Sequence, residues 1–147
     1  MSNTVNLHRV LKAPVERVYR AFIDPAAMAS WIPPYGYICK VHEFSPKVGG
    51  KYRMSFTNFT NQQETFWGGS WIDIKPNVLL KYIDKFEDPN LPGEMTVTIH
   101  FKEVPCGTEI NIKQEGIPSV IPAEMCYLGW QDSLDKLKKL VEPEIKQ

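Results

Sequence analysis

The last long segment of the chain, residues 122–142, constrains the fold most strongly because its apolar residues follow helical spacing. Pro122 suits the first position of a helix, and Pro143 suits a position just past its end. A helix of about 21 residues spans about 31 Å. Such a helix must bury its apolar side against another element. Steps of four, four, three and four place one stripe on that side: Cys126, Trp130, Leu134, Leu137 and Val141.

The preceding part of the chain predicts mainly β-strands. An initial strand over residues 5–12 is followed by two short helices, one opened by Pro14 and one over residues 25–31 that Asp24 can cap. The connections between later strands are too short for crossover helices, so the sheet should be antiparallel. The chain is therefore predicted to be an α+β protein whose long C-terminal helix covers a sheet of about seven strands. Alternation predicts six strands after the short helices, over residues 37–44, 51–59, 64–75, 78–85, 94–102 and 108–115.

Length and charge narrow the class of protein. The 147 residues favour one domain, residues 1–147, which needs no metal or disulfide to fold. The 17 Lys and Arg residues equal the 17 Asp and Glu residues, which argues against a nucleic-acid binder and a polybasic membrane anchor. No apolar run approaches the ~20 residues of a membrane span, and residues 1–6 lack signal-peptide features. Three distant cysteines favour a reducing compartment, so we expect a cytoplasmic location.

Four motifs occur in order along nearly the whole chain. They are Ala13–Tyr19 with Asp24-Pro25 and Trp31, Val48–Arg53, Gly69 with Ile74–Pro76, and Gly129-Trp130 with Leu134 and Leu137. In these motifs the chain resembles the activator-of-heat-shock-chaperone-ATPase-like (AHSA-type) proteins of the START or SRPBCC helix-grip superfamily, although Tyr19 stands where the family often has tryptophan. The resemblance implies a curved antiparallel sheet that grips a long C-terminal helix, with a cavity between them. It also implies ligand binding, chaperone interaction or cyclase-type chemistry as possible activities.

Aromatic side chains are the first candidates for a functional site, because small-molecule sites are mostly apolar. The same residues could instead fill a core, and for Trp130, at the centre of the stripe, we favour core packing. The pair Gly68-Gly69 predicts a bulge or a close backbone approach, so alternation does not decide which face Trp67 and Trp71 occupy. The residues predicted to line a cavity are Trp31, Phe56, Trp71, Ile99, Tyr127 and Trp130.

Polar candidates are few. Asp73 follows Trp71 by two positions, so it would be a buried acid if Trp71 faced the cavity. His100 could act as a general base only if it pointed inward, whereas its alternation with Ile99 and Phe101 predicts that it points outward. The three histidines share no metal-ligand spacing, and we expect no metal or other cofactor. Nucleophile motifs and phosphate-binding loops are absent from the sequence.

Three functions are compatible with these patterns. The first is the binding of a small hydrophobic or amphipathic ligand between the sheet and the long helix. The second is a co-chaperone-like protein that docks on a heat-shock chaperone and modulates its ATPase. The third is a cyclase or dehydratase that uses an acid or base in the cavity. Met125 and Leu128 lie opposite the apolar stripe; they could form a partner or homodimer surface, but we expect them to pack within the molecule.

Overall fold

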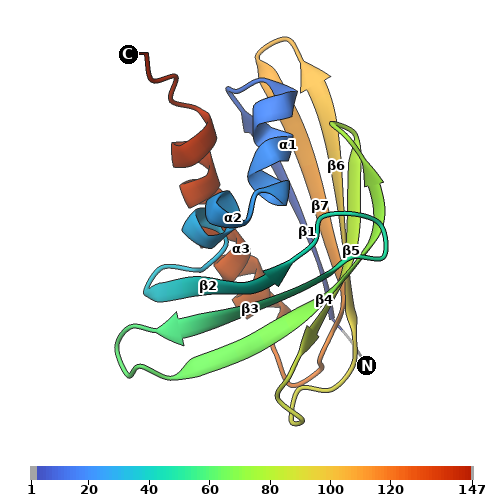
Figure 1. The fold of residues 1–147 in the computed structure, drawn as a ribbon, viewed down its shortest axis with the longest axis vertical. Helices are drawn as coiled ribbons and strands as arrows, with labels where there is room; N and C mark the ends of the chain where they lie inside the picture. Colours follow the sequence, from blue (N-terminus) through green and yellow to red (C-terminus); the bar gives the residue numbers. More distant parts are fainter. Residues whose placement is uncertain (1–2, 147) are drawn as a thin grey trace.

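The computed structural model describes residues 3–146, which form a curved seven-stranded sheet and three helices (Figure 1). The order of the elements confirms the sequence prediction: a strand, two short helices, six strands and a long helix. The ends differ from the predicted ones by only a few residues. The elements are β1 (Asn3–Leu11), α1 (Val15–Ile23), α2 (Pro25–Trp31), β2 (Tyr37–Phe44), β3 (Lys51–Asn58), β4 (Glu64–Lys75), β5 (Leu79–Phe86), β6 (Met95–Val104), β7 (Gly107–Ile117) and α3 (Ala123–Val141).

Every pair of neighbouring strands is antiparallel, in the order β1-β7-β6-β5-β4-β3-β2. Strands β2 to β6 each pair with the next strand in the chain, and β1 lies at the edge of the sheet beside β7. In Figure 1, β2, β3 and β4 sweep across below α1 and α2 while β6 and β7 stand upright, so the sheet curls around α3. This arrangement confirms the predicted helix-grip fold.

The two halves of α3 have different surroundings. In its C-terminal half, the stripe residues Leu134, Leu137 and Val141 are at most 1% exposed. In its N-terminal half, Cys126 and Trp130 are only partly buried. The C-terminal half therefore closes the core, whereas the N-terminal half borders a less filled space. No helix within residues 3–146 is both long enough and apolar enough to cross a membrane.

The two short helices complete the core beside β6. The Oδ1 atom of Asp24 accepts hydrogen bonds from the backbone N–H groups of residues 26 and 27, at 2.9 and 3.1 Å, and this confirms the predicted cap. Phe22 packs edge-on against Trp31 and Phe101, with ring centres 4.7 and 5.3 Å apart. The Trp31 indole N–H donates to the backbone oxygen of Ala21 at 2.8 Å. This part of the molecule is filled, and the polar atom of Trp31 is satisfied.

Candidate functional site

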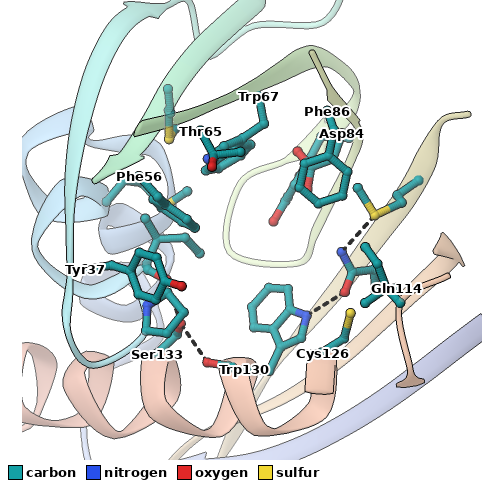
Figure 2. Close-up of a pocket in the computed structure, with 18 of the residues that line it drawn as sticks. Tyr37, Phe56, Thr65, Trp67, Asp84, Phe86, Gln114, Cys126, Trp130 and Ser133 are labelled. Atoms are coloured by element: carbon teal, nitrogen blue, oxygen red, sulfur yellow. Dashed lines mark hydrogen bonds between the residues drawn. The ribbon is translucent and has the colours of Figure 1, made fainter. Parts of the chain in front are cut away.

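A cavity of about 370 Å³ lies between the N-terminal half of α3 and the inner face of β3, β4 and β5 (Figure 2). Its volume falls within the range of about 300–1,000 Å³ that is typical of small-molecule sites. Asp84 is the one carboxylic acid among the described lining side chains, and none of them is Lys, Arg or His. The lining aromatics include Tyr37, Phe56, Trp67, Trp71, Phe86 and Trp130.

A row of residues across three strands positions Asp84. Tyr52 on β3 pairs with Gly69 on β4, and Gly69 pairs with Asp84 on β5. Because Gly69 has no side chain, the Tyr52 hydroxyl passes close to it and reaches both the Asp84 carboxyl and, at 2.5 Å, the backbone oxygen of Ile83. A Cβ atom on residue 69 would collide with that oxygen. The predicted close backbone approach at the glycine pair is therefore confirmed, and it opens the path from Tyr52 to Asp84.

The geometry around Asp84 favours its neutral form. The Tyr52 hydroxyl has one hydrogen, so it can donate to the carboxyl or to the Ile83 oxygen but not to both. If Oδ1 of Asp84 carries a proton, Asp84 donates to Tyr52 and Tyr52 donates to Ile83, and both contacts become hydrogen bonds. Burial raises the pKa of Asp84 to about 7, and a hydrogen bond donated by Tyr52 to the ionised carboxylate opposes this rise to a smaller extent.

Two tryptophans on β4 flank this row. Trp67 and Trp71 each lie two residues from Gly69, and their side chains are 8% and 3% exposed. Neither Nε1 atom has a hydrogen-bond partner among the described residues. A buried N–H group without an acceptor is destabilising by about 1–3 kcal/mol. These two indole N–H groups of the cavity wall thus lack, among the described residues, the hydrogen-bond acceptor that the Trp31 N–H has in the core.

Trp130 forms the α3 side of the cavity, and its ring is held in place. Its indole N–H donates to Oε1 of Gln114 at 2.9 Å, and Nε2 of Gln114 lies 3.5 Å from the sulfur of Met95 (Figure 2). One helical turn further on, the Ser133 hydroxyl donates to the backbone oxygen of Ile32 at 2.6 Å. The Gln114 bond holds the indole of Trp130 at the edge of the cavity, and the Ser133 bond ties α3 to the residue that follows α2.

The structure brings together three of the six side chains predicted to line a cavity. Phe56, Trp71 and Trp130 lie along it. Trp31 and Ile99 do not line it, since both are fully buried in the filled core. Tyr127 is 41% exposed and lies outside it, because it is turned about 100° around the helix from Cys126, which does line it. Ligand contact by any of the six stays a prediction.

The acid in the cavity is not the one considered from the sequence. The register shifts between Trp71 and Asp73, so Asp73 does not follow Trp71 into the cavity. His100 is exposed, as its alternation predicted, and lies outside this cavity. Asp84 and Tyr52 were missed. A signal for Asp84 was available, because period two places Leu80, Tyr82, Asp84 and Phe86 on one face of β5.

Met125 and Leu128 are exposed to 63% and 59%. The expectation that they pack within the molecule is therefore wrong. Met125 contributes to the rim of the cavity, while Leu128 does not. The physical reason is that the sheet and α2 cover only one side of α3, so no helix or strand of residues 3–146 packs on the side opposite the buried stripe.

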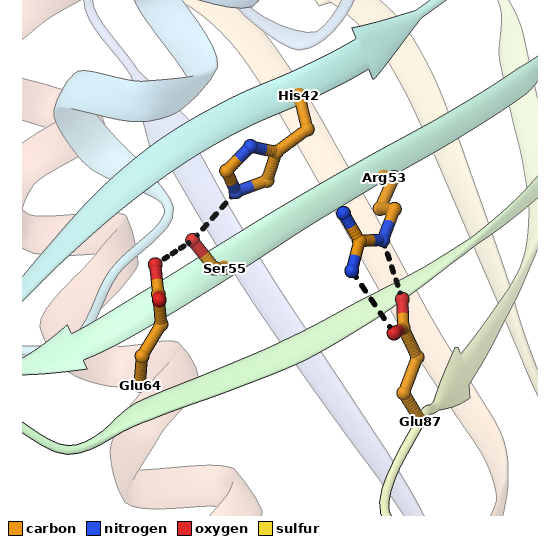
Figure 3. Close-up of polar contacts among 5 residues, drawn as sticks. All are labelled: His42, Arg53, Ser55, Glu64 and Glu87. Atoms are coloured by element: carbon orange, nitrogen blue, oxygen red, sulfur yellow. Dashed lines mark hydrogen bonds and ion pairs between the residues drawn. The ribbon is translucent and has the colours of Figure 1, made fainter.

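A second polar cluster lies on the sheet face that points away from the helices (Figure 3). The Ser55 hydroxyl donates to Glu64 at 2.8 Å and lies 2.8 Å from Nε2 of His42. Arg53 donates two hydrogen bonds to Glu87, at 2.8 and 3.1 Å. Ser55 is 0% exposed, so its hydroxyl is closed to a substrate. We interpret this cluster as a structural tie between β2, β3, β4 and the end of β5.

The family can now be assigned. The sequence model of the family described as "Activator of Hsp90 ATPase homolog 1-like protein" matches residues 12–142. This chain belongs to that family. The assignment confirms the resemblance found in the four sequence motifs, and it supports a domain of the ligand-binding or co-chaperone type. No protein with a curated description matches the chain.

Solved structures of bacterial proteins are similar to this chain. One from Chromobacterium violaceum is 51% identical, with a TM-score of 0.96 over 97% of this chain and 99% of that chain. One from Rhodobacter sphaeroides is 21% identical, with a TM-score of 0.82 over 92% and 90%. One from Nitrosomonas europaea is 21% identical, with a TM-score of 0.77 over 93% and 92%. The last two demonstrate a shared fold only.

Proposed function

We propose that this protein binds a small, largely apolar molecule in the cavity between α3 and β3–β5. The observation that carries the proposal is a space of about 370 Å³ with mainly aromatic walls, beside a core that is otherwise filled. An apolar molecule that enters this space gains roughly 25 cal/mol for each Å² of surface removed from water, before the costs of binding are subtracted. The hydrogen bond that holds Trp130 against Gln114 supports an open cavity.

A substitution at Gly129 tests this proposal. Gly129 lines the cavity, and a Cβ atom there would meet only Pro34, at a comfortable 3.8 Å. Gly129→Phe should fill the space, while Gly129→Ala adds one methyl group and serves as the matched control. Binding of ethylnaphthalene, followed by shifts of backbone amide signals in NMR spectra, should be lost in the phenylalanine variant and kept in the alanine variant. Equal binding by both variants would place the ligand elsewhere.

Docking on a chaperone is the second candidate, and the exposed side chains of α3 favour it. The family description names an Hsp90 ATPase activator, and Leu128 offers an uncovered apolar side chain outside the cavity. The test is the ATPase rate of a purified Hsp90-class chaperone with and without this protein. Under the docking proposal, Leu128→Asp abolishes any stimulation and Gly129→Phe preserves it. Under the ligand proposal, Leu128→Asp keeps ethylnaphthalene binding, whereas Gly129→Phe loses it.

A further inference from the structure

The cavity contains a buried acid, and no basic side chain within residues 3–146 lines the cavity with it. Asp84 is only 9% exposed, and the described side chains that share the cavity with it include no Lys, Arg or His. Buried carboxylates in proteins are normally paired with a cation or kept neutral, because removing an unpaired charge from water is costly. The site therefore lacks the positive group that its own acid would require in the ionised state.

The free oxygen of Asp84 accepts hydrogen bonds in either protonation state. Oδ1 is occupied by Tyr52, and no described residue makes a hydrogen bond to Oδ2. If the acid is neutral, the network with Tyr52 and Ile83 places the proton on Oδ1, which leaves Oδ2 as a carbonyl-type acceptor. If the acid is ionised, Oδ2 is a stronger acceptor. Figure 2 shows Asp84 among the side chains that surround the cavity. A complementary ligand must present a hydrogen-bond donor.

The walls around this acceptor suit a positive donor. Tyr52 packs against Trp71 with ring centres 5.8 Å apart, and Trp71 packs against Tyr82 at 5.2 Å. Trp67 adds a fourth ring, 6.1 Å from Tyr52. Aromatic faces attract cations, and rings grouped around an acid form a site of the kind that binds organic ammonium groups. A ligand without charge would use only the apolar part of these walls.

We propose that the ligand is a small apolar amine, whose ammonium group pairs with the Asp84 carboxyl and whose hydrocarbon body lies against the aromatic walls. This inference rests on the proposed function, because it specifies the chemistry of a ligand for the same cavity. The step is non-covalent. The amine supplies the missing counter-charge, and its N–H groups donate to Oδ2.

Four probes of nearly equal size separate this inference from the proposed function. They share a naphthalene body and differ in one group: naphthylmethylamine, naphthylmethanol, ethylnaphthalene and naphthoate. Titration calorimetry at pH 8 should find that the amine binds at least about 10-fold more tightly than ethylnaphthalene, because hydrogen bonds to charged groups exceed neutral ones. Naphthoate should bind most weakly. Equal affinities for all four would overturn the amine inference alone, whereas no binding of any probe would overturn the proposed function as well.

Substitution of the acid provides a second, independent measurement. Asp84→Asn should remove the preference for naphthylmethylamine over naphthylmethanol. Asp73→Asn changes an acid on β4 that does not line the cavity, so it should keep the preference. A preference that survives Asp84→Asn would overturn the inference. An alcohol that binds wild-type protein as tightly as the amine would also overturn it, because a neutral acceptor would then explain the binding.

The pH profile completes the test. The other titratable side chains on the cavity walls are Tyr37, Tyr52, Tyr82 and Cys126. Burial raises the pKa values of the last three, which stay uncharged. Naphthylmethylamine affinity should therefore rise as pH increases from 5 to 8 and Asp84 ionises, while ethylnaphthalene affinity should not rise. An amine affinity that is flat or falls across this range would contradict the proposal.

Discussion

Two aromatic regions of this protein differ in whether their buried polar groups have partners. In the core between α1, α2 and β6, the rings of Phe22, Trp31 and Phe101 are buried, and the Trp31 N–H has an acceptor. In the cavity region on β3–β5, the rings also pack edge-on, but two indole N–H groups lack described partners and a buried acid has no basic side chain beside it among the described cavity residues. Aromatic content therefore does not identify a binding site by itself. Open volume together with unmatched polar groups distinguishes the candidate site from the core.

Removing a whole aromatic ring should give the largest difference in stability between the two regions. Trp31→Ala should lower the free energy of unfolding by about 3–5 kcal/mol, because it opens a large hole in a filled core. Trp130→Ala should cost less, since Trp130 is only partly buried and already borders empty space. Urea denaturation of both variants measures the difference. Equal losses would contradict the distinction between core and cavity.

The buried acid should make stability depend on pH. The pKa of Asp84 is raised from 3.8 to about 7, so between these values the folded protein retains a proton that the unfolded chain has released. Stability should therefore fall as pH rises through this window, by at most about 4 kcal/mol, and then level off. Asp84→Asn should flatten this part of the profile and be more stable than wild type at pH 8. Thermal unfolding from pH 4 to pH 8 provides the measurement. If stability depends on pH as steeply in Asp84→Asn as in wild type, groups other than Asp84 cause the dependence.

Replacing an indole ring by phenyl, which removes its N–H group, should sharpen the comparison further. Trp31→Phe leaves the backbone oxygen of Ala21 without its donor, whereas Trp71→Phe removes an N–H group that has no described acceptor. The ring contraction is the same in both variants. The Trp31 variant should therefore lose about 1–2 kcal/mol more stability than the Trp71 variant. The reverse order in chemical denaturation would indicate that the Trp71 N–H is satisfied.

The elements could be predicted from the sequence because their signals are local. Helical spacing along residues 122–142 and strand alternation in β3 and β6 survive in the structure. The cavity was harder to predict than the elements, because its volume depends on the distance between α3 and the sheet. The stripe residue Trp130 borders space while Leu134, one turn later, is fully buried. Nothing in the spacing of the stripe distinguishes these two positions.

The acid was missed for a different reason. The alternation in β4 breaks between Trp71 and Asp73. Counting by two from Trp71 therefore points to Asp73 on β4, although the acid in the cavity lies on β5. The alternation in β5 is unbroken from Leu80 to Phe86 and contains Asp84. A polar residue at an inward position of a regular strand was thus the more informative signal. Its partner Tyr52 becomes visible only through the cross-strand pairing at Gly69.

The central claim is that a small molecule enters the cavity region and not the core. The most direct measurement is an NMR spectrum of the four tryptophan indole N–H signals, assigned with single Trp→Phe variants, before and after addition of naphthylmethylamine. The account predicts that the signals of Trp67, Trp71 and Trp130 shift while the signal of Trp31 stays in place. Shifts of similar size at all four, or at none, would contradict it.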